Sequence, residues 1–249
     1  MSTRVAAPSG ILETAFNKLV ARRVEVSAVE TPSDGFRLIT LAGLDLQERL
    51  WAPGYMVQVA LGGWESRAYT PFAYDAQAGA LTFAGYVHGG GIGSDWLQAA
   101  SVGEERFIVG PRAALNLSKL DRPTMVFGDE TSLSTAAAFL ATPQGLSGVH
   151  CFFEVASVGP CRALLDRLGV TCAATLVTRE ADGRHLQELE PRLLEVFRTA
   201  PETRGIFTGK AASIQRLYQA LRRAGVPGKQ LTNLAYWAPG RKGFSGVQR

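Results

Sequence analysis

The chain has 249 residues, a formal net charge of +4, and 46% hydrophobic against 19% charged residues. This balance excludes an intrinsically disordered chain, and the length allows one or two domains with a sizeable core. No apolar run approaches the roughly 20 residues of a membrane-spanning helix, and the basic residues form no dense patch that would predict nucleic-acid binding.

The first half of the chain predicts strands. Residues 1–10 are polar and lack the apolar segment of a secretory signal, so we expect a cytoplasmic protein. Short runs of branched and aromatic residues then alternate with Gly, Pro, Asp and Ser, which predicts an antiparallel β-barrel or sandwich. One short helix, Ser94 to Ala100, interrupts the strands. The strand segments are 24–29, 36–41, 56–61, 80–87 and 106–109.

The second half predicts an alternation of strands and helices. Strand-like segments are 124–127, 149–154, 173–177, 205–208 and 231–237, and helix-like segments are 131–140, 161–168, 186–197 and 212–224. This alternation predicts a Rossmann-like parallel α/β sheet with helices on both faces. We place the boundary near Ser118 to Pro123, which gives domains 1–120 and 121–249.

The cysteines predict neither a disulfide framework nor a metal site. Cys151, Cys161 and Cys172 are odd in number and lack the CxxC spacing of metal ligands. We expect buried or partly buried free thiols, with redox or iron–sulfur chemistry as the alternative, and no bound metal.

The segment Arg67-Ala68-Tyr69-Thr70 combines a cation, an aromatic ring and a hydroxyl within four residues. A guanidinium stays charged and can bind two oxygens of a phosphate. Tyr69 could lie against a planar cofactor ring, and the Thr70 hydroxyl could bond near its reactive nitrogen, so both are catalytic candidates. The alternative is an ordinary strand with a surface arginine.

A glycine-rich run follows about twenty residues later and opens onto the short helix. Its backbone N–H groups can face a pyrophosphate without obstruction by a Cβ atom, and Ser94 is expected to cap the helix. With Arg67, this run predicts a flavin dinucleotide site; the alternative is a flexible hairpin loop before a capped helix. Its candidate residues are His88 (in a positioning role), Gly91, Gly93, Ser94 and Trp96.

A third candidate segment is Gly128-Asp129-Glu130-Thr131, which follows a strand and opens a helix. A doubly wound sheet binds nucleotides at such a crossover. Thr131 could position a nicotinamide, or Asp129 and Glu130 could simply cap the helix and offset its dipole.

Together these motifs make the chain resemble the siderophore-interacting proteins, a branch of the ferredoxin-reductase-like flavoenzymes, from about Val24 to Gly243. The resemblance implies an FAD-binding barrel, a domain for NADPH or NADH, and reduction of ferric siderophores. The segments that carry it are Arg67-x-Tyr69-Thr70, His88 with its glycine loop and Ser94-x-Trp96, Val109-Gly110-Pro111-Arg112, Phe127 to Leu133, and Tyr236-Trp237-x-x-Gly240.

The resemblance also implies roles for residues late in the chain. Thr178-Arg179 would bind the 2′-phosphate of NADPH, with a solvated arginine as the alternative. Tyr236 and Trp237 would lie near the flavin, or serve as core or lid residues. The substrate-binding candidates are the cations Lys210, Arg241 and Lys242, which could attract an anionic substrate or simply be solvated.

Four positions depart from the family pattern. Phe72 stands where an arginine is usual, and Ile92 lies in a loop that usually reads Gly-Pro-Ala-Ser. Lys210 replaces an acidic residue, and Ala235 replaces a glycine.

We therefore expect a reductase that passes electrons from NADPH or NADH through FAD to a ferric siderophore or another ferric chelate and releases Fe(II). One alternative is a flavin reductase that serves another acceptor, such as a redox partner protein. The other is a non-catalytic protein that binds flavin or siderophore.

Overall fold

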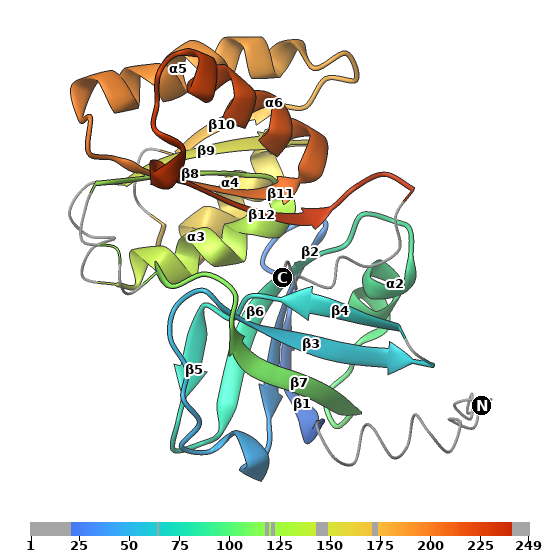
Figure 1. Cartoon of the computed structure of the whole chain (residues 1–249). Coiled ribbons are helices and arrows are strands. Elements are labelled where there is room, and N and C mark those ends of the chain that lie inside the picture. The colour runs from blue at the N-terminus through green and yellow to red at the C-terminus, as the bar shows by residue number, and fades with distance from the viewer. Residues whose placement is uncertain are drawn as a thin grey trace.

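The computed structural model describes residues 21–63, 65–117, 120, 123–142, 149–170 and 174–240. Within them the chain forms a seven-stranded antiparallel sheet followed by a five-stranded parallel sheet with helices on both faces. Figure 1 shows the two as separate bodies, stacked one above the other. The predicted two-domain fold, an antiparallel β-domain before a parallel α/β sheet, is confirmed.

The first sheet curves into a barrel. Its strand order is β4-β3-β7-β1-β2-β6-β5. Alternate side chains of β6 are buried, including Leu81 and Phe83, as expected for a strand with one face on a core. The ring of Tyr69 in β4, at one end of the sheet, stacks on Phe83 of β6, the second strand from the other end, at 4.4 Å between centroids. The strands are β1 (Arg22–Glu30), β2 (Phe36–Ala42), β3 (Tyr55–Gly62), β4 (Glu65–Tyr69), β5 (Ala73–Asp75), β6 (Ala80–Tyr86) and β7 (Glu105–Ala113).

The α-helix α2 (Ile92–Ala99) lies in the connection between β6 and β7. Trp96 and Leu97 on its inner face join the barrel core. The helix begins at Ile92 with Gly91 as its N-cap residue, so the expectation that Ser94 caps it is wrong. Ser94 lies within the first turn, where its buried hydroxyl accepts a hydrogen bond from the Gly89 N–H at 3.1 Å.

The second sheet has the strand order β10-β9-β8-β11-β12, with all neighbours parallel. Every residue of β8 is buried, as expected for a central strand covered on both faces. The chain moves outward from β8 through β9 to β10 and then returns to the other side of β8, so the order reverses between β8 and β11. The strands are β8 (Thr124–Gly128), β9 (Val149–Val155), β10 (Ala174–Thr178), β11 (Arg204–Lys210) and β12 (Leu231–Trp237).

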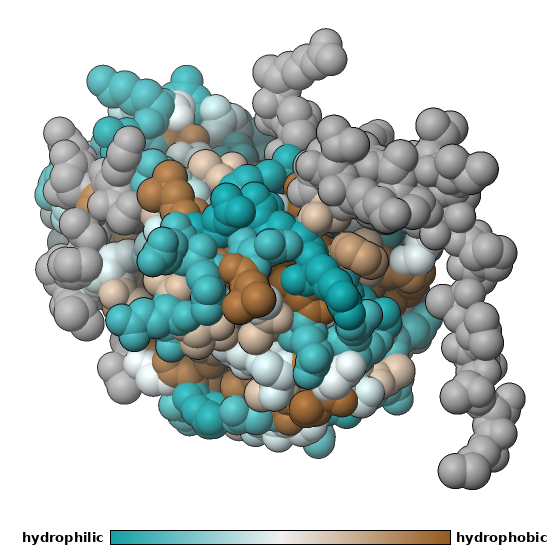
Figure 2. Space-filling view, turned by 90° about the horizontal axis from the view of Figure 1, so that it is seen from below, coloured by the Kyte–Doolittle hydropathy of each residue, from teal (hydrophilic) through white to brown (hydrophobic). Residues whose placement is uncertain are grey.

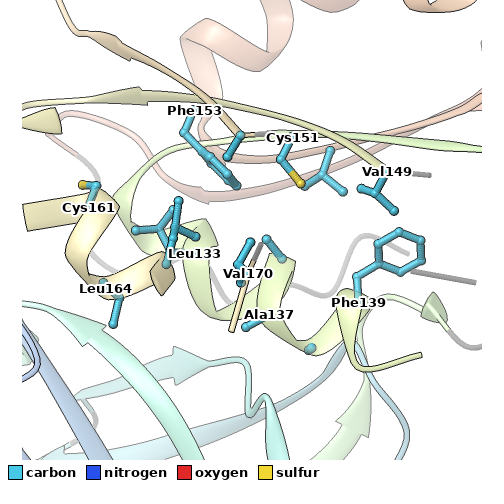
Figure 3. Close-up of a cluster of buried hydrophobic side chains, with 14 of the residues drawn as sticks. Leu133, Ala137, Phe139, Val149, Cys151, Phe153, Cys161, Leu164 and Val170 are labelled. Atoms are coloured by element: carbon cyan, nitrogen blue, oxygen red, sulfur yellow. The ribbon is translucent and has the colours of Figure 1, made fainter. Parts of the chain in front are cut away.

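Among the residues described, four α-helices cover this sheet. In Figure 1, α3 (Leu133–Leu140) and α4 (Val158–Arg167) lie between the sheet and the barrel, and α5 (Arg184–Thr199) and α6 (Ala211–Arg223) cover the opposite face. Helix α4 begins three residues before the predicted Cys161. Figure 3 shows Leu133 of α3, Leu164 of α4 and Phe153 of β9 gathered in one apolar cluster, to which the buried Cys151 and Cys161 also belong. Cys172 lies outside the described residues.

The two domains share this apolar cluster. Phe36 and Leu38 of β2 are buried in it together with Leu133 and Phe139 of α3. Polar contacts flank it: the Ser33 hydroxyl donates to the Pro160 carbonyl at 2.9 Å, and Arg167 pairs with Glu30 at 2.7 Å. The predicted boundary at residues 120 and 121 falls between β7 and β8.

The described part of the surface seen in Figure 2 shows no single broad apolar patch. Figure 2, which views the molecule from the barrel side, shows hydrophobic residues scattered among hydrophilic ones. The most exposed large hydrophobic side chains of the described barrel residues are Leu44, Leu50, Val102 and Phe107. A search of the described helices finds none that combines the length and the apolar character of a membrane span.

Candidate functional site

Arg67 and the first turn of α2 form one side of the candidate site. The Arg67 side chain packs on Gly93 so closely that a Cβ atom there would lie 2.9 Å from the Arg67 Cγ. The guanidinium is half-buried, and its Nη1 donates to the Ser66 carbonyl at 2.8 Å. The described residues give it no carboxylate partner, so its positive charge remains available beside the N-terminus of the helix.

Tyr69 lies next to Arg67 on the same strand. Its ring stacks on Phe83 with an interplanar angle of 17° and meets Trp96 of α2 at 5.7 Å. Burial raises the pKa of the Tyr69 phenol well above its usual value, and the Arg67 charge opposes this effect. Tyr69 is therefore a neutral aromatic surface beside a cation.

The glycine loop before α2 is open. A Cβ atom added at Gly89, Gly90 or Gly91 would meet nothing within 4 Å among the described residues. This open space lies beside the first turn of α2, where backbone N–H groups favour anions. His88, which opens the loop, is exposed, and its ring lies 6.0 Å from that of Tyr86.

Thr70, directly after β4, joins the barrel to the second domain. The Tyr236 hydroxyl lies 3.4 Å from the Thr70 Oγ1 and 2.8 Å from the Thr135 Oγ1 of α3. The Ser134 hydroxyl donates to the Thr70 carbonyl at 2.6 Å. Burial raises the pKa of Tyr236, so its hydroxyl stays protonated at neutral pH. The structure thus brings Tyr69, Thr70 and Tyr236 close together.

Asp129 lies fully buried at the carboxyl end of β8, where the strand order reverses. Its Oδ1 accepts from the Thr131 N–H at 2.9 Å and from the Thr131 hydroxyl at 2.5 Å. Its Oδ2 accepts from the Trp237 indole at 2.7 Å. Burial raises the pKa of Asp129 to about 6, although these hydrogen bonds favour the ionised form. Asp129 therefore has the capping role that the sequence offered as one alternative, and the Thr131 hydroxyl is engaged with it.

Two further residues pack around Asp129. Gly209 has a φ of +94°, and a Cβ atom there would lie 2.5 Å from the Asp129 carboxyl group. Only glycine fits this approach of β11 to Asp129. The Lys210 ammonium lies 5.9 Å from the centroid of the Trp237 ring, within the range of a cation–π contact. Lys210 and Trp237 thus lie together at the ends of β11 and β12.

A buried polar network lies further along the same edge of the sheet. Arg179 Nη2 pairs with Glu130 Oε2 at 2.5 Å and also donates to the Glu154 carbonyl at 2.8 Å. Glu154 Oε2 lies 2.6 Å from His185 Nε2, and His185 Nδ1 accepts from the Glu180 N–H at 3.0 Å. Because Nδ1 accepts, His185 is the neutral tautomer that donates through Nε2.

This network revises the reading of two sequence segments. Arg179 is neither solvated nor free, because its side chain is only 19% exposed and binds two acidic residues. Glu130 does not cap a helix: its Oε1 accepts from the Ala156 N–H at 2.5 Å. Sequence reasoning missed Glu154 and His185; the one signal was an acidic residue directly after the apolar run Cys151-Phe152-Phe153.

Two features lie apart from the candidate site. Arg241 and Lys242, the other predicted substrate-binding residues, fall outside the described residues. A hollow of about 460 Å³ between β9 and α5 is lined by His150, Phe152, Pro191 and others, none of them a predicted site residue. His150 is near the amino end of β9, whereas ligands of open α/β sheets bind at the carboxyl ends.

The residues around β4 and α2 fit a flavin dinucleotide. They provide an available guanidinium, an open glycine loop beside a helix N-terminus, and the half-buried aromatic ring of Tyr69. Anionic phosphates require the first two features, and a planar ring system can use the third. No arginine stands at position 72: Phe72 packs against the apolar cluster shared by the two domains.

Comparison with known proteins agrees with this geometry. Residues 64–115 match the siderophore-interacting FAD-binding domain family. A comparison with curated protein sequences gives no match. The resemblance to the siderophore-interacting proteins is thereby confirmed for the segment that holds Arg67, Tyr69 and the glycine loop.

Solved structures show the same fold over nearly the whole chain. A siderophore utilization protein from T. fusca is 21% identical with a TM-score of 0.70, covering 91% of this chain and 95% of that one. The siderophore-interacting protein SipS from Aeromonas hydrophila is 20% identical with a TM-score of 0.69, covering 89% and 93%. The ferredoxin reductase of carbazole 1,9a-dioxygenase, in its FAD apo form, is 20% identical with a TM-score of 0.71, covering 87% and 67%.

Proposed function

We propose that this chain, which carries a siderophore-interacting FAD-binding domain, is a reductase that passes electrons from a nicotinamide nucleotide through FAD to a ferric siderophore. The observation that carries the proposal is the hydrogen-bonded junction of Thr70, Tyr236 and Thr135. It joins the end of the strand that bears Arg67 and Tyr69 to the carboxyl edge of the parallel sheet, so the two candidate cofactor sites adjoin.

The barrel residues would hold the flavin. Arg67 and the N–H groups of the glycine loop and α2 would bind the phosphates, and Ser94 would keep that loop in shape through its bond to Gly89. Tyr69 would lie against the ring system, and Thr70 would donate a hydrogen bond at its edge. When bound, FAD would supply two-electron hydride chemistry toward the donor and one-electron transfer toward the acceptor, so that one hydride suffices for two ferric ions.

The second domain would bring in the electron donor. Its strand order reverses between β8 and β11, where nucleotides bind in open α/β sheets. Asp129 fixes the turn after β8 and the position of Trp237, and Tyr236 contacts Thr70. The small hydroxyl of Thr70 would let the donor approach closely, provided that the Tyr236 side chain moves aside.

The ferric chelate would dock beside the flavin. Lys210, held over Trp237, is a cation near this junction and would attract an anionic chelate. Reduction weakens binding by hard oxygen ligands, which prefer Fe(III), and so releases the iron as Fe(II).

The test is to purify the protein, reconstitute it with FAD and follow visible absorption without oxygen. We expect bleaching by NADH or NADPH and re-oxidation by a ferric siderophore, with Fe(II) trapped by a chelator that absorbs when it binds Fe(II). Re-oxidation by a small iron–sulfur protein but by no ferric chelate would favour the other acceptor class, a redox partner protein. A protein that takes up no FAD would overturn the proposal.

A further inference from the structure

The guanidinium of Arg179 is already bound within the domain. Nη2 contacts Glu130 Oε2 at 2.5 Å and the Glu154 carbonyl at 2.8 Å, and Nε lies 3.8 Å from Glu154 Oε1. The side chains of Glu130 and Glu154 are only 3% and 1% exposed. If Arg179 turned away to bind a ligand, two buried carboxylates would lose their cation, which is strongly unfavourable.

The residues after β10, together with Glu130 and Glu154 that contact Arg179, carry more negative than positive charge. Beyond Arg179, the next cation is the exposed Arg184, and it pairs with Asp182 at 2.6 Å and lies 3.9 Å from Glu180. His185 is neutral, as its hydrogen bonds show. A third guanidinium, that of Arg216 on α6, donates to the Gly183 carbonyl at 3.1 Å. Three guanidinium groups therefore lie here among four carboxylates, which are Glu130, Glu154, Glu180 and Asp182.

The position of these charged residues in the sheet determines which part of a bound dinucleotide would lie beside them. Tyr236 lies in β12, one edge strand of the sheet, and contacts Thr70 of the barrel. Strand β10 forms the opposite edge. A dinucleotide lying across the carboxyl ends, with its nicotinamide at Thr70, extends its adenosine half toward β9 and β10. In such folds a nearby arginine is what accommodates the 2′-phosphate of NADP.

We propose that the electron donor is NADH and that Glu130 sets this specificity, because it occupies the arginine that a 2′-phosphate would need. The inference rests on the proposed function. A 2′-phosphate would add up to two negative charges beside an acidic cluster, whereas an unmodified ribose brings neutral hydroxyls that carboxylates can accept from. NADH thus fits the charges of this edge of the sheet, and NADPH does not.

The first experiment measures binding without turnover. NAD⁺ and NADP⁺ are titrated into the FAD-reconstituted protein by calorimetry, and we expect NAD⁺ to bind at least tenfold more tightly. Equal or tighter binding of NADP⁺ would overturn the inference, and so would the absence of binding by both at millimolar concentration. The proposed flavin site would survive either result if the protein remains yellow, so the two failures are distinguishable.

The second experiment removes the carboxylate charge that binds Arg179. Glu130→Gln keeps the side-chain shape and an oxygen for the Ala156 N–H but removes the charge that binds Arg179. We expect the preference for NAD⁺ over NADP⁺ to fall at least fivefold. The matched control is Glu195→Gln on the exposed side of α5, which should leave the preference unchanged. An unchanged preference in a folded Glu130→Gln variant would show that Glu130 does not set it.

Discussion

The indole N–H of Trp237 donates to the Asp129 carboxylate across 2.7 Å, which ties the last strand of the sheet to the turn after its first. The other oxygen of Asp129 accepts two bonds from Thr131. The carboxyl group is fully buried, and burial raises its pKa from 3.8 to about 6. One side chain thus determines both the shape of the crossover turn and the position of Trp237.

The raised pKa of Asp129 predicts a pH-dependent stability. The folded state binds the proton more tightly than the unfolded state, so the free energy of unfolding should fall as the pH rises from about 4 to about 6 and then level off. A shift of two units corresponds to about 3 kcal/mol. Urea unfolding at several pH values should show this decline in the native protein and lose it in Asp129→Asn. Asp182→Asn, at an exposed carboxylate, is the control; a decline of equal size in Asp129→Asn would contradict the assignment.

Removing the Tyr236 hydroxyl should weaken the junction between the domains. Tyr236→Phe leaves the hydroxyls of Thr70 and Thr135 without this partner, and we expect the free energy of unfolding to fall by about 1 kcal/mol. Denaturant unfolding measures the change. The control is Tyr218→Phe on α6, whose hydroxyl makes no hydrogen bond with the described residues. A Tyr236→Phe variant as stable as the native protein would mean that the contact contributes nothing.

Arg67→Ala should reduce the affinity for FAD. A hydrogen bond to a charged group contributes about 1.5–3 kcal/mol, which corresponds to roughly a 10- to 150-fold weaker binding. Titration of the apoprotein, followed by quenching of flavin fluorescence, gives the dissociation constants. Arg23→Ala, at an exposed pair with Glu105, should bind FAD as the native protein does. Full FAD occupancy in Arg67→Ala would remove this residue from the site.

Gly209→Ala should destabilise the protein. The new Cβ would lie 2.5 Å from the Asp129 carboxyl group, at a φ of +94° that side chains rarely adopt. We expect a loss of about 1–3 kcal/mol from the backbone strain, before the steric clash is added. Gly159→Ala on α4, where a Cβ would have open space, should change the stability by less than about 0.5 kcal/mol. Thermal unfolding of the two variants side by side decides the matter: similar melting temperatures would refute the close approach.

Local sequence patterns predicted the fold well because the spacing of apolar residues along a segment reflects which of its faces is buried. The apolar segments 80–87 and 124–127 were predicted as strands, and the structure adds that β8 is covered on both faces and β6 has one face on a core. The start of α2 was misplaced by two residues because Gly91, and not a side-chain cap, begins the helix. Ser is a preferred N-cap residue, so the sequence favoured Ser94 as the cap over the glycine that has this position in the structure.

The candidate site was predictable only where its residues lie close together along the chain. Arg67, Tyr69 and Thr70 form one motif, and the structure adds that Arg67 packs on Gly93 of the second motif. The Glu130–Arg179–Glu154 network could not be predicted, because the parallel register of β9 and β10 and the crossover after β8 create it. Nothing local distinguishes an arginine that will bind a phosphate from one that two distant carboxylates will occupy.

Helix α3 is buried along almost its whole length, since the sheet lies on one side of it and the barrel on the other, whereas α4 keeps an exposed face. Phe36 and Leu38 of the barrel are buried in the same cluster as Leu133 and Phe139, so the boundary along the chain is not a boundary in the core. Separating the halves would expose this cluster on both. After a protease cut between β7 and β8, the two fragments should therefore remain associated and migrate as one species, because side-chain packing holds them together without the covalent link.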